Sequence, residues 1–202
     1  MPKLLIALLL ILSTAAWAQE PCEKRLALLL DAFNANNYET VEKFIHPDTG
    51  LYILYKTGAY SAFTRFNTLN DFKNWFSSYQ GRGNTIFCTN CAFSNYTVKL
   101  GLPPYFNMEC GGVDESAERN TLYLENTSQQ AELSTAVSAY SRQIVEHFDA
   151  RPLPEATIEK IKSLETFSYR AAAVNLPFIL YLTLIDGEWY LTALAVGDSC
   201  DA

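Results

Sequence analysis

The sequence predicts one α+β domain, in which an antiparallel sheet packs on N-terminal helices and extra helices lie at about 131–165. Three observations predict this class. Apolar residues recur with a helical period near the N-terminus and again from 131 to 165. Three strand-like runs close the chain. No repeat, low-complexity tract or linker divides the sequence, so residues 19–202 are expected to form a single domain.

The first 18 residues have the features of a signal peptide. Lys3 precedes nine apolar residues, Leu4–Leu12, and the small residues that follow end in the cleavage-site pattern Ala16-Trp17-Ala18. The apolar run is shorter than the roughly 20 residues needed to cross a bilayer. We therefore expect residues 1–18 to be removed and the protein to be exported, to a periplasm or to the extracellular space, with no membrane attachment afterwards.

Two helices are expected after the signal peptide. The first, at 21–33, has an apolar stripe with i, i+3, i+4, i+7 spacing, which consists of Leu26, Leu29, Leu30 and Phe33. The second is shorter, at about 39–45, and places Val41, Phe44 and Ile45 inward. Such stripes predict helices that pack one face on a core.

The segment His46-Pro-Asp-Thr-Gly50 is predicted to end the second helix. Pro47 disfavours a helical conformation at His46. Asp48 can form a turn with its own backbone, and Gly50 suits a left-handed position. A strand is expected directly afterwards, at 51–55.

The middle of the chain contains one more helix and several candidate strands. The helix is predicted at 68–80, where Thr68 and Asp71 have the spacing of a capping box. Between Gly, Pro and Asn residues, strand candidates follow at 84–88, 95–100 and 121–126.

Helical spacing then returns in the two extra helices. The first, at 131–148, places Leu133, Val137, Tyr140, Ile144 and Phe148 on one face. The sequence Arg-Pro-Leu-Pro at 151–154 ends it, and Pro154 begins the second helix. In that helix Ile158, Ile161 and Leu164 are expected to face inward.

Three strands at 166–174, 178–185 and 188–196 form the predicted C-terminal sheet. Asp186-Gly187 is typical of a two-residue type I′ turn, which sets Ile185 opposite Glu188. One face of the last two strands is then wholly apolar, and the other is mixed. The apolar face carries Phe178, Leu180, Leu182, Leu184, Trp189, Leu191, Ala193 and Ala195.

The mixed face is predicted to be a homodimer contact or a partner site. It sets Tyr181 opposite Thr192 and Thr183 opposite Tyr190, and tyrosine is enriched at interfaces. In the alternative interpretation, the extra helices at 131–165 cover this face.

Composition excludes some partners. The chain has 15 basic and 22 acidic side chains and a formal net charge of −7, without a dense basic cluster. A nucleic-acid backbone requires a positive protein surface, so nucleic acid is not expected as a partner. The expected partners are a small apolar ligand or a protein, and a homodimer is a further expectation.

Five cysteines follow the signal peptide, and export favours disulfide bonds between them. We expect Cys22 to pair with Cys200, because chain termini often lie near each other, and one bridge within the group Cys88, Cys91 and Cys110. Five is odd, so at least one thiol stays free or pairs between chains.

A redox pair at Cys88 and Cys91 would need a helix after the motif, and the sequence there is β-like. No cofactor or metal is expected, since only two histidines are present and a second CxxC is missing.

Two segments match the pattern for N-linked glycosylation. They are Asn95-Tyr96-Thr97 and Asn126-Thr127-Ser128. The pattern has a consequence only in a eukaryotic secretory route, and the short signal peptide favours a bacterial source.

The order of the elements resembles the nuclear-transport-factor-2-like superfamily, which includes the ketosteroid isomerases. Two N-terminal helices lead into a strand and a third helix, and the chain closes with a meander that ends in DGEWYLTALAV, at 186–196. The resemblance covers roughly residues 22–80 and 166–196. It implies a curved, cone-like sheet wrapped on helices, often around a pocket and often in a dimer. It implies no particular reaction.

Two classes of function follow. The first is an exported, non-catalytic module that binds a ligand or a partner. The second is an isomerase- or dehydratase-like enzyme with a carboxylate or histidine base in the cone. Its candidate residues are His46, Asp48 and Tyr55, with Asp71 as a further carboxylate, and turn, cap and core roles explain each of them equally well.

Overall fold

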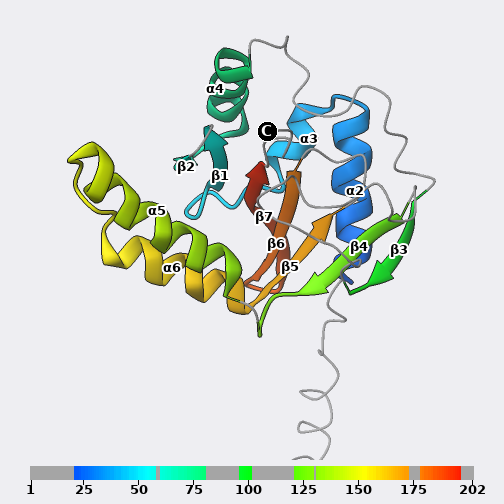
Figure 1. The fold of residues 1–202 in the computed structure, drawn as a ribbon. Helices are drawn as coiled ribbons and strands as arrows, with labels where there is room; N and C mark the ends of the chain where they lie inside the picture. Colours follow the sequence, from blue (N-terminus) through cyan, green and yellow to red (C-terminus); the bar gives the residue numbers. More distant parts are fainter. Residues whose placement is uncertain are drawn as a thin grey trace, which may run out of the picture.

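A computed structural model describes residues 21–57, 60–80, 96–101, 121–129, 131–172 and 178–196. These residues form helices and strands in an order that confirms the α+β class (Figure 1). The helices are α2 (Cys22–Asn34), α3 (Tyr38–Glu42), α4 (Leu69–Gln80), α5 (Glu132–Phe148) and α6 (Glu155–Thr166). The strands are β1 (Leu51–Thr57), β2 (Tyr60–Phe66), β3 (Thr97–Leu100), β4 (Thr121–Asn126), β5 (Ser168–Ala172), β6 (Phe178–Ile185) and β7 (Glu188–Val196).

The strands form one open sheet in the order β2-β1-β7-β6-β5-β4-β3. Most neighbours are antiparallel, but β1 pairs in parallel with β7, and β3 pairs in parallel with β4. The predicted antiparallel sheet is therefore confirmed only in part, because the sheet is mixed. Tight hairpins impose antiparallel pairing, whereas β1 and β7 come from opposite ends of the chain and β3 and β4 are joined by a long connection.

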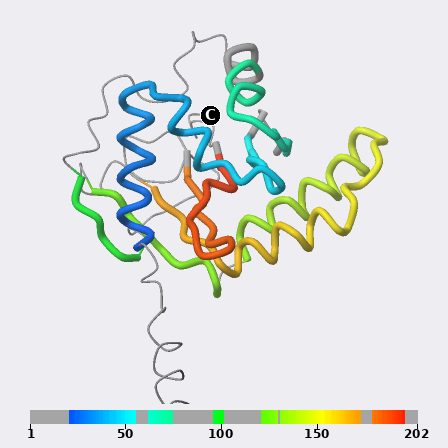
Figure 2. Tube along the Cα trace, turned by 180° about the vertical axis from the view of Figure 1, so that it is seen from behind, coloured from blue at the N-terminus to red at the C-terminus, as the bar shows by residue number. Residues whose placement is uncertain are grey.

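Helices lie on both faces of the sheet and create two cores (Figures 1 and 2). The first core contains the apolar faces of α2 and α3 and the start of α4. The second core lies between the other sheet face and the helices α5 and α6. Strand β1 divides its side chains between them, because Leu51 and Ile53 belong to the first core and Tyr52 and Leu54 to the second. This alternation is expected of a strand that is covered on both faces.

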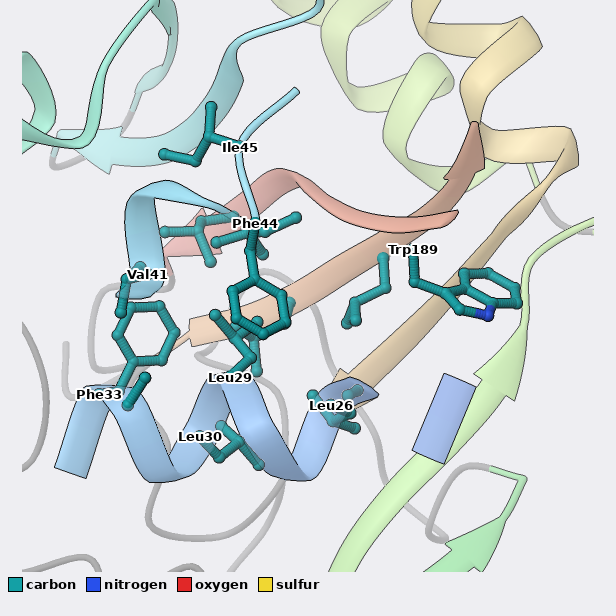
Figure 3. Packing of buried hydrophobic residues seen from close by; sticks show 14 of the residues in the cluster. Leu26, Leu29, Leu30, Phe33, Val41, Phe44, Ile45 and Trp189 are labelled. Atoms are coloured by element: carbon teal, nitrogen blue, oxygen red, sulfur yellow. The ribbon is translucent and has the colours of Figure 1, made fainter. Parts of the chain in front are cut away.

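The first core confirms the helical stripe predicted from the sequence. Its α2 residues are buried against the sheet, and the segment after α3 closes over them (Figure 3). Each such Leu or Phe side chain contributes about 1.5–3 kcal/mol when it is fully buried. The residues labelled in Figure 3 are Leu26, Leu29, Leu30, Phe33, Val41, Phe44, Ile45 and Trp189.

Local signals at two other elements are also confirmed. Thr68 Oγ1 accepts a hydrogen bond from the Asp71 amide at 3.1 Å and donates to the Asp71 carboxylate at 2.8 Å, as expected for the cap of α4. The turn between β6 and β7 has positive φ angles at Asp186 (51°) and Gly187 (88°), which is the type I′ geometry. Strand β2 was not predicted.

A β-bulge interrupts the predicted register of the last hairpin. Pairing follows the prediction from Ile185 with Glu188 to Leu182 with Leu191, and it includes Thr183 opposite Tyr190. Beyond this point Tyr181 pairs with Ala193 rather than with Thr192, so that Thr192 has no cross-strand partner. The predicted pair of Tyr181 and Thr192 is therefore wrong.

The bulge also exchanges the faces of the residues that follow it. Leu194 enters the first core, whereas Ala193 and Ala195 lie in the second core. The predicted apolar face had the two alanines on the same side as Leu182. A turn sets the register only as far as the next irregularity, which explains the difference.

Helices α5 and α6 form an antiparallel pair that extends from the sheet, here called the arm (residues 132–166). They confirm the extra helices expected at about 131–165. The root of the arm joins β4 and β5, and its far end lies away from the other elements in both views (Figures 1 and 2). Near the root, Leu133, Val137 and Ile161 are buried in the second core.

Candidate functional site

Helix α3 ends at Glu42, three residues before the predicted end at 45 and ahead of the segment expected to stop it, and His46 closes a separate turn that follows. The His46 Nδ1 atom accepts hydrogen bonds from the backbone amides of Asp48 (3.2 Å) and Thr49 (3.3 Å). The His46 carbonyl accepts one from the amide of Gly50, which has a φ of +70°. Asp48 was expected to bond its own backbone, but the histidine side chain takes that role. Since Nδ1 accepts both bonds, it carries no proton in this arrangement.

Of the other two catalytic candidates, Asp48 belongs to this turn, whereas Tyr55 lies further along the chain, on β1. Asp48 is exposed, and its carbonyl rather than its carboxylate accepts hydrogen bonds from Arg65 (3.1 Å) and Lys160 (3.4 Å). Tyr55 is half-buried against the first core. It lies four residues beyond the start of β1, which is about 13 Å along a strand. The structure therefore brings His46 and Asp48 together in one turn but does not bring Tyr55 to them.

The residues predicted to form an interface are mostly covered. Tyr181, Thr183 and Thr192 are 1%, 1% and 2% exposed on the sheet face that carries the arm. Tyr190 is partly exposed, and its ring meets that of His46 edge to face at 4.9 Å. The burial of Tyr181, Thr183 and Thr192 agrees with the alternative interpretation, in which the extra helices cover this face.

A group of four charged side chains lies at the root of the arm. Arg170, on β5, is 2% exposed. Its Nε and Nη2 atoms donate to the Glu125 carboxylate on β4 at 2.9 Å and 2.6 Å, and its Nη1 atom donates to Glu132 on α5. Arg170, Glu125 and Glu132, together with Glu165 of α6, are here called the charged cluster. It joins two strands of the sheet to both helices of the arm.

Glu165 caps the first turn of α5 from a distance in sequence. Its carboxylate accepts hydrogen bonds from the amides of Leu133 (2.7 Å) and Ser134 (3.1 Å) and from the Ser134 hydroxyl (2.7 Å). The N-cap residue of α5, Ala131, has no side-chain hydrogen bond to give. A carboxylate from the last turn of α6 thus satisfies amides that would otherwise lack partners.

Two groups at the root of the arm, Arg170 and its neighbour Tyr181, have raised pKa values. Burial acts to lower the pKa of Arg170, but the hydrogen bonds and charges of Glu132 and Glu125 outweigh it and raise that pKa. Burial raises the pKa of the neighbouring Tyr181, against the opposing effect of the Arg170 charge. Both groups keep their ordinary neutral-pH forms, so Arg170 remains the cation of its ion pairs with Glu125 and Glu132.

A line of buried hydroxyls continues the polar contacts across the sheet. The Thr183 hydroxyl lies 2.6 Å from the hydroxyls of both Ser168 and Thr192. Every buried side-chain nitrogen and oxygen of the described residues has a hydrogen-bond partner. The polar interior is therefore satisfied by the protein itself.

Sequence reasoning missed the charged cluster. One signal was present, because Arg170 is the only charged residue in the strand-like run 166–174. A single arginine in such a strand requires a buried acidic partner. The residues around Arg170 do not indicate which carboxylates it contacts, because Glu125 and Glu132 lie 45 and 38 positions away.

The predicted disulfides stay predictions. Cys22 is 4% exposed in the first core, and burial raises the pKa of its thiol to about 12. Cys88, Cys91, Cys110 and Cys200 lie outside the described residues, as does the strand candidate at 84–88.

Searches for a metal site, a membrane span and known relatives add no assignment. In the described part of the chain, no group of three or more His, Cys, Asp or Glu side chains is placed to hold a metal ion. The helices of that part are all too short or too polar to cross a bilayer. No family model, curated protein or solved structure matches the sequence.

Proposed function

We propose that this protein is an exported, non-catalytic module that binds a protein partner through the far end of the arm. The observation that carries the proposal is the exposure of large apolar side chains there. Val145 is 45% exposed and Phe148 is 56% exposed, both in the last turn of α5. Apolar side chains in the middle of a charged surface are typical of contact sites for other proteins.

The construction of the arm supports this proposal. Its root is held by Arg170 and Glu165, which connect β5 to both helices. Ile144, next to Val145 on α5, is partly exposed, whereas Ile158 on α6 packs against the second core. A rigidly held helix pair loses little conformational freedom on binding, which favours affinity.

The placement of the predicted catalytic residues favours binding over catalysis. His46 is engaged in a backbone turn before β1, and Tyr55 lies on β1 itself, near its far end. A general base must reach the substrate together with its partner groups. These residues do not supply such a pair, so the enzyme alternative gains no support from them.

The resemblance to the nuclear-transport-factor-2-like superfamily remains part of the proposal. It is supported by the order of elements, since α2 and α3 precede β1, α4 follows, and β5, β6 and β7 close the chain as a meander. The proposal includes the curved, cone-like form of the sheet and export after removal of residues 1–18. This family contains non-catalytic binding modules as well as enzymes.

A photo-crosslinking experiment tests the proposed binding surface. A photoreactive amino acid is placed at Phe148 in the full chain, expressed in a host that exports it, and a matched protein carries it at Thr135. Thr135 is exposed on the same helix but near the root. We expect one discrete crosslinked species from position 148 and none from position 135. Equal crosslinking at both positions, or none at either, would contradict the proposal.

A second measurement shows that binding, rather than folding, is affected. The partner identified by mass spectrometry is purified, or a second copy of this chain is used if the species has twice its mass. Val145→Ser with Phe148→Ser should then weaken binding by at least tenfold, since exposed anchors of this size often contribute more than about 1 kcal/mol each. The melting temperature should change little, because surface substitutions usually stay within about 0.5 kcal/mol.

A further inference from the structure

The glycosylation pattern at 126–128 lies at a well-defined place in the fold. Asn126 is the last residue of β4, and the chain then turns towards α5. Asn126 and Ser128 are exposed, whereas Thr127 between them is 2% exposed. Asn126 and Ser128, which the pattern requires, thus both face solvent. Thr127, at the position where the pattern sets no requirement that the fold must meet, is the buried residue.

The side chain of Asn126 has a suitable local geometry. Its Oδ1 atom accepts a hydrogen bond from the Ser128 amide at 2.8 Å, which forms a turn closed by the asparagine itself. Within the described residues, its Nδ2 atom donates no hydrogen bond. The turn involves three consecutive residues only, so it can form in a nascent chain before the sheet exists.

We propose that Asn126 is an acceptor for an N-linked oligosaccharide whenever this chain passes through a secretory lumen that supplies a lipid-diphosphate-linked donor. The inference rests on the export that belongs to the proposed function. In the transfer, Nδ2 forms a bond to the anomeric carbon of the sugar, and the bond from that carbon to the diphosphate breaks. The diphosphate leaves with the electron pair, and Nδ2 gives one proton to a base of the transferase.

The geometry assists this step at one point. An amide nitrogen is a weak nucleophile because its electron pair is delocalised onto Oδ1. The hydrogen bond that Oδ1 receives from Ser128 draws electron density from the amide group, so that Nδ2 loses its proton more easily. Ser128 therefore positions and polarises the acceptor.

The finished fold has room for the sugar. Thr127 Oγ1 lies within hydrogen-bond distance of the Glu165 carbonyl (2.6 Å) and the Ser168 carbonyl (2.9 Å), which anchors the turn to the root of the arm. The glycan would extend into solvent from Asn126, at the end of the arm opposite to Phe148. Modification and the proposed partner surface are therefore compatible.

The test uses the full chain produced in a secreting eukaryotic cell. Protein from the lumen or the medium is treated with an amidase that removes N-glycans and converts the linked asparagine into aspartate, and peptides are then weighed. We expect the mass change at position 126 in the unaltered chain. It should be absent in Asn126→Gln and in Ser128→Ala, which remove the acceptor and the hydroxyl of the pattern.

A third variant separates the pattern from the fold. Thr127→Val preserves the pattern but removes the hydroxyl that anchors the turn, so the glycan should remain while the melting temperature falls by several degrees. An unmodified position 126 in secreted protein overturns the proposal, even if Asn95 carries a glycan. Failure of the chain to enter the lumen, seen as protease sensitivity in isolated microsomes, overturns it through the export on which it rests.

Discussion

Arg170 is the buried cation of two ion pairs at the root of the arm. It is buried, it contacts carboxylates from β4 and α5, and its neighbour Tyr181 lies in the second core. Its two acidic partners retain partial contact with water, since the side chains of Glu125 and Glu132 are 22% and 44% exposed. The cluster is therefore intermediate between a buried ion pair and a surface one.

Replacement of Arg170 by Met should destabilise the protein. The substitution leaves two carboxylates near a buried site without a cation, and we expect a loss of about 2–3 kcal/mol in the free energy of unfolding. This is less than for a fully buried pair, because water can solvate both carboxylates. Urea denaturation measures the change.

Lys162→Met is the matched control for that substitution. Lys162 pairs with Glu159 at 3.9 Å, and both side chains are 62% exposed. Loss of such a pair should cost no more than about 0.5 kcal/mol. Equal effects of the two substitutions would show that the charged cluster does not hold the arm.

The Cys22 thiol should make the reduced protein sensitive to alkaline pH. Burial, with a smaller effect from the Glu23 charge, raises its pKa from 9.0 to about 12. Below pH 9 the thiol is protonated in both states and stability is unaffected. Above pH 9 only the unfolded chain loses the proton, so stability falls as pH rises towards 12.

A comparison with Cys22→Ala isolates this effect. Between pH 8 and pH 10.5 the reduced wild type should lose about 2 kcal/mol more than the variant, following about 1.4 kcal/mol per pH unit. Urea denaturation at both pH values provides the measurement. Parallel losses in the two proteins would contradict a buried thiol at position 22.

At the scale of elements, α5 depends on α6 for its first turn. Helix α4 has a local cap in Thr68, whereas the N-cap residue of α5, Ala131, offers none and Glu165 takes that role. The two helices of the arm should therefore form together. A helix with a remote cap has no local signal at its start.

Glu165→Ala should cost more than Thr68→Ala. The first removes acceptors for two amides and one hydroxyl inside the protein, and the second removes one exposed cap. We expect about 2–3 kcal/mol for Glu165→Ala and about 1 kcal/mol for Thr68→Ala, by urea denaturation. Amide exchange at Leu133 and Ser134 should accelerate only in the Glu165 variant.

The bulge in β7 makes an unusual deletion tolerable. Thr192 has no cross-strand partner, so its removal leaves Leu191 opposite Leu182 and Ala193 opposite Tyr181. The faces of all other residues are preserved. We expect the deleted protein to fold, with a loss of about 1–2 kcal/mol from the missing hydroxyl contacts.

Deletion of Tyr190 is the control for that prediction. It also removes one residue from β7, but Leu191 would then leave the first core and Thr192 would enter it. A lost buried leucine costs about 2–5 kcal/mol. Circular dichroism melts of the two deletions should differ by several degrees, at about 2–4 °C per kcal/mol for a domain of this size, and similar melts would contradict the assigned register.

For the whole molecule, export and the terminal disulfide are tested together. N-terminal sequencing of exported protein should begin at Gln19, after Ala18. Non-reducing peptide mapping should find Cys22 joined to Cys200, a bridge that would close most of the domain and contribute about 4–5 kcal/mol in the entropic treatment. Met1 on soluble cytoplasmic protein would contradict export, and unpaired Cys22 in exported protein would contradict the bridge.

Local patterns were sufficient for most helices and for the part of the last hairpin between its turn and Leu182. The stripe in α2, the cap of α4 and the Asp186-Gly187 turn each depend on residues within one or two turns of chain. Strand β2 was missed because the segment 60–66 mixes polar and apolar residues without a clear period. Its assignment depends on pairing with β1 rather than on its own sequence.

The sequence by itself determined the α+β class, the positions of α2, α4, α5 and α6, the start of α3 and the type I′ turn, because periodicity, capping and turn chemistry act over a few residues. Only the tertiary structure decided the parallel pairing of β1 with β7, the bulge at Thr192 and the partners of Arg170. Each of these features either joins residues that are distant in sequence or is one of several pairings that the local sequence would allow equally well. Their selection depends on which arrangement buries both cores and satisfies the buried charges at once, and that is a property of the complete fold.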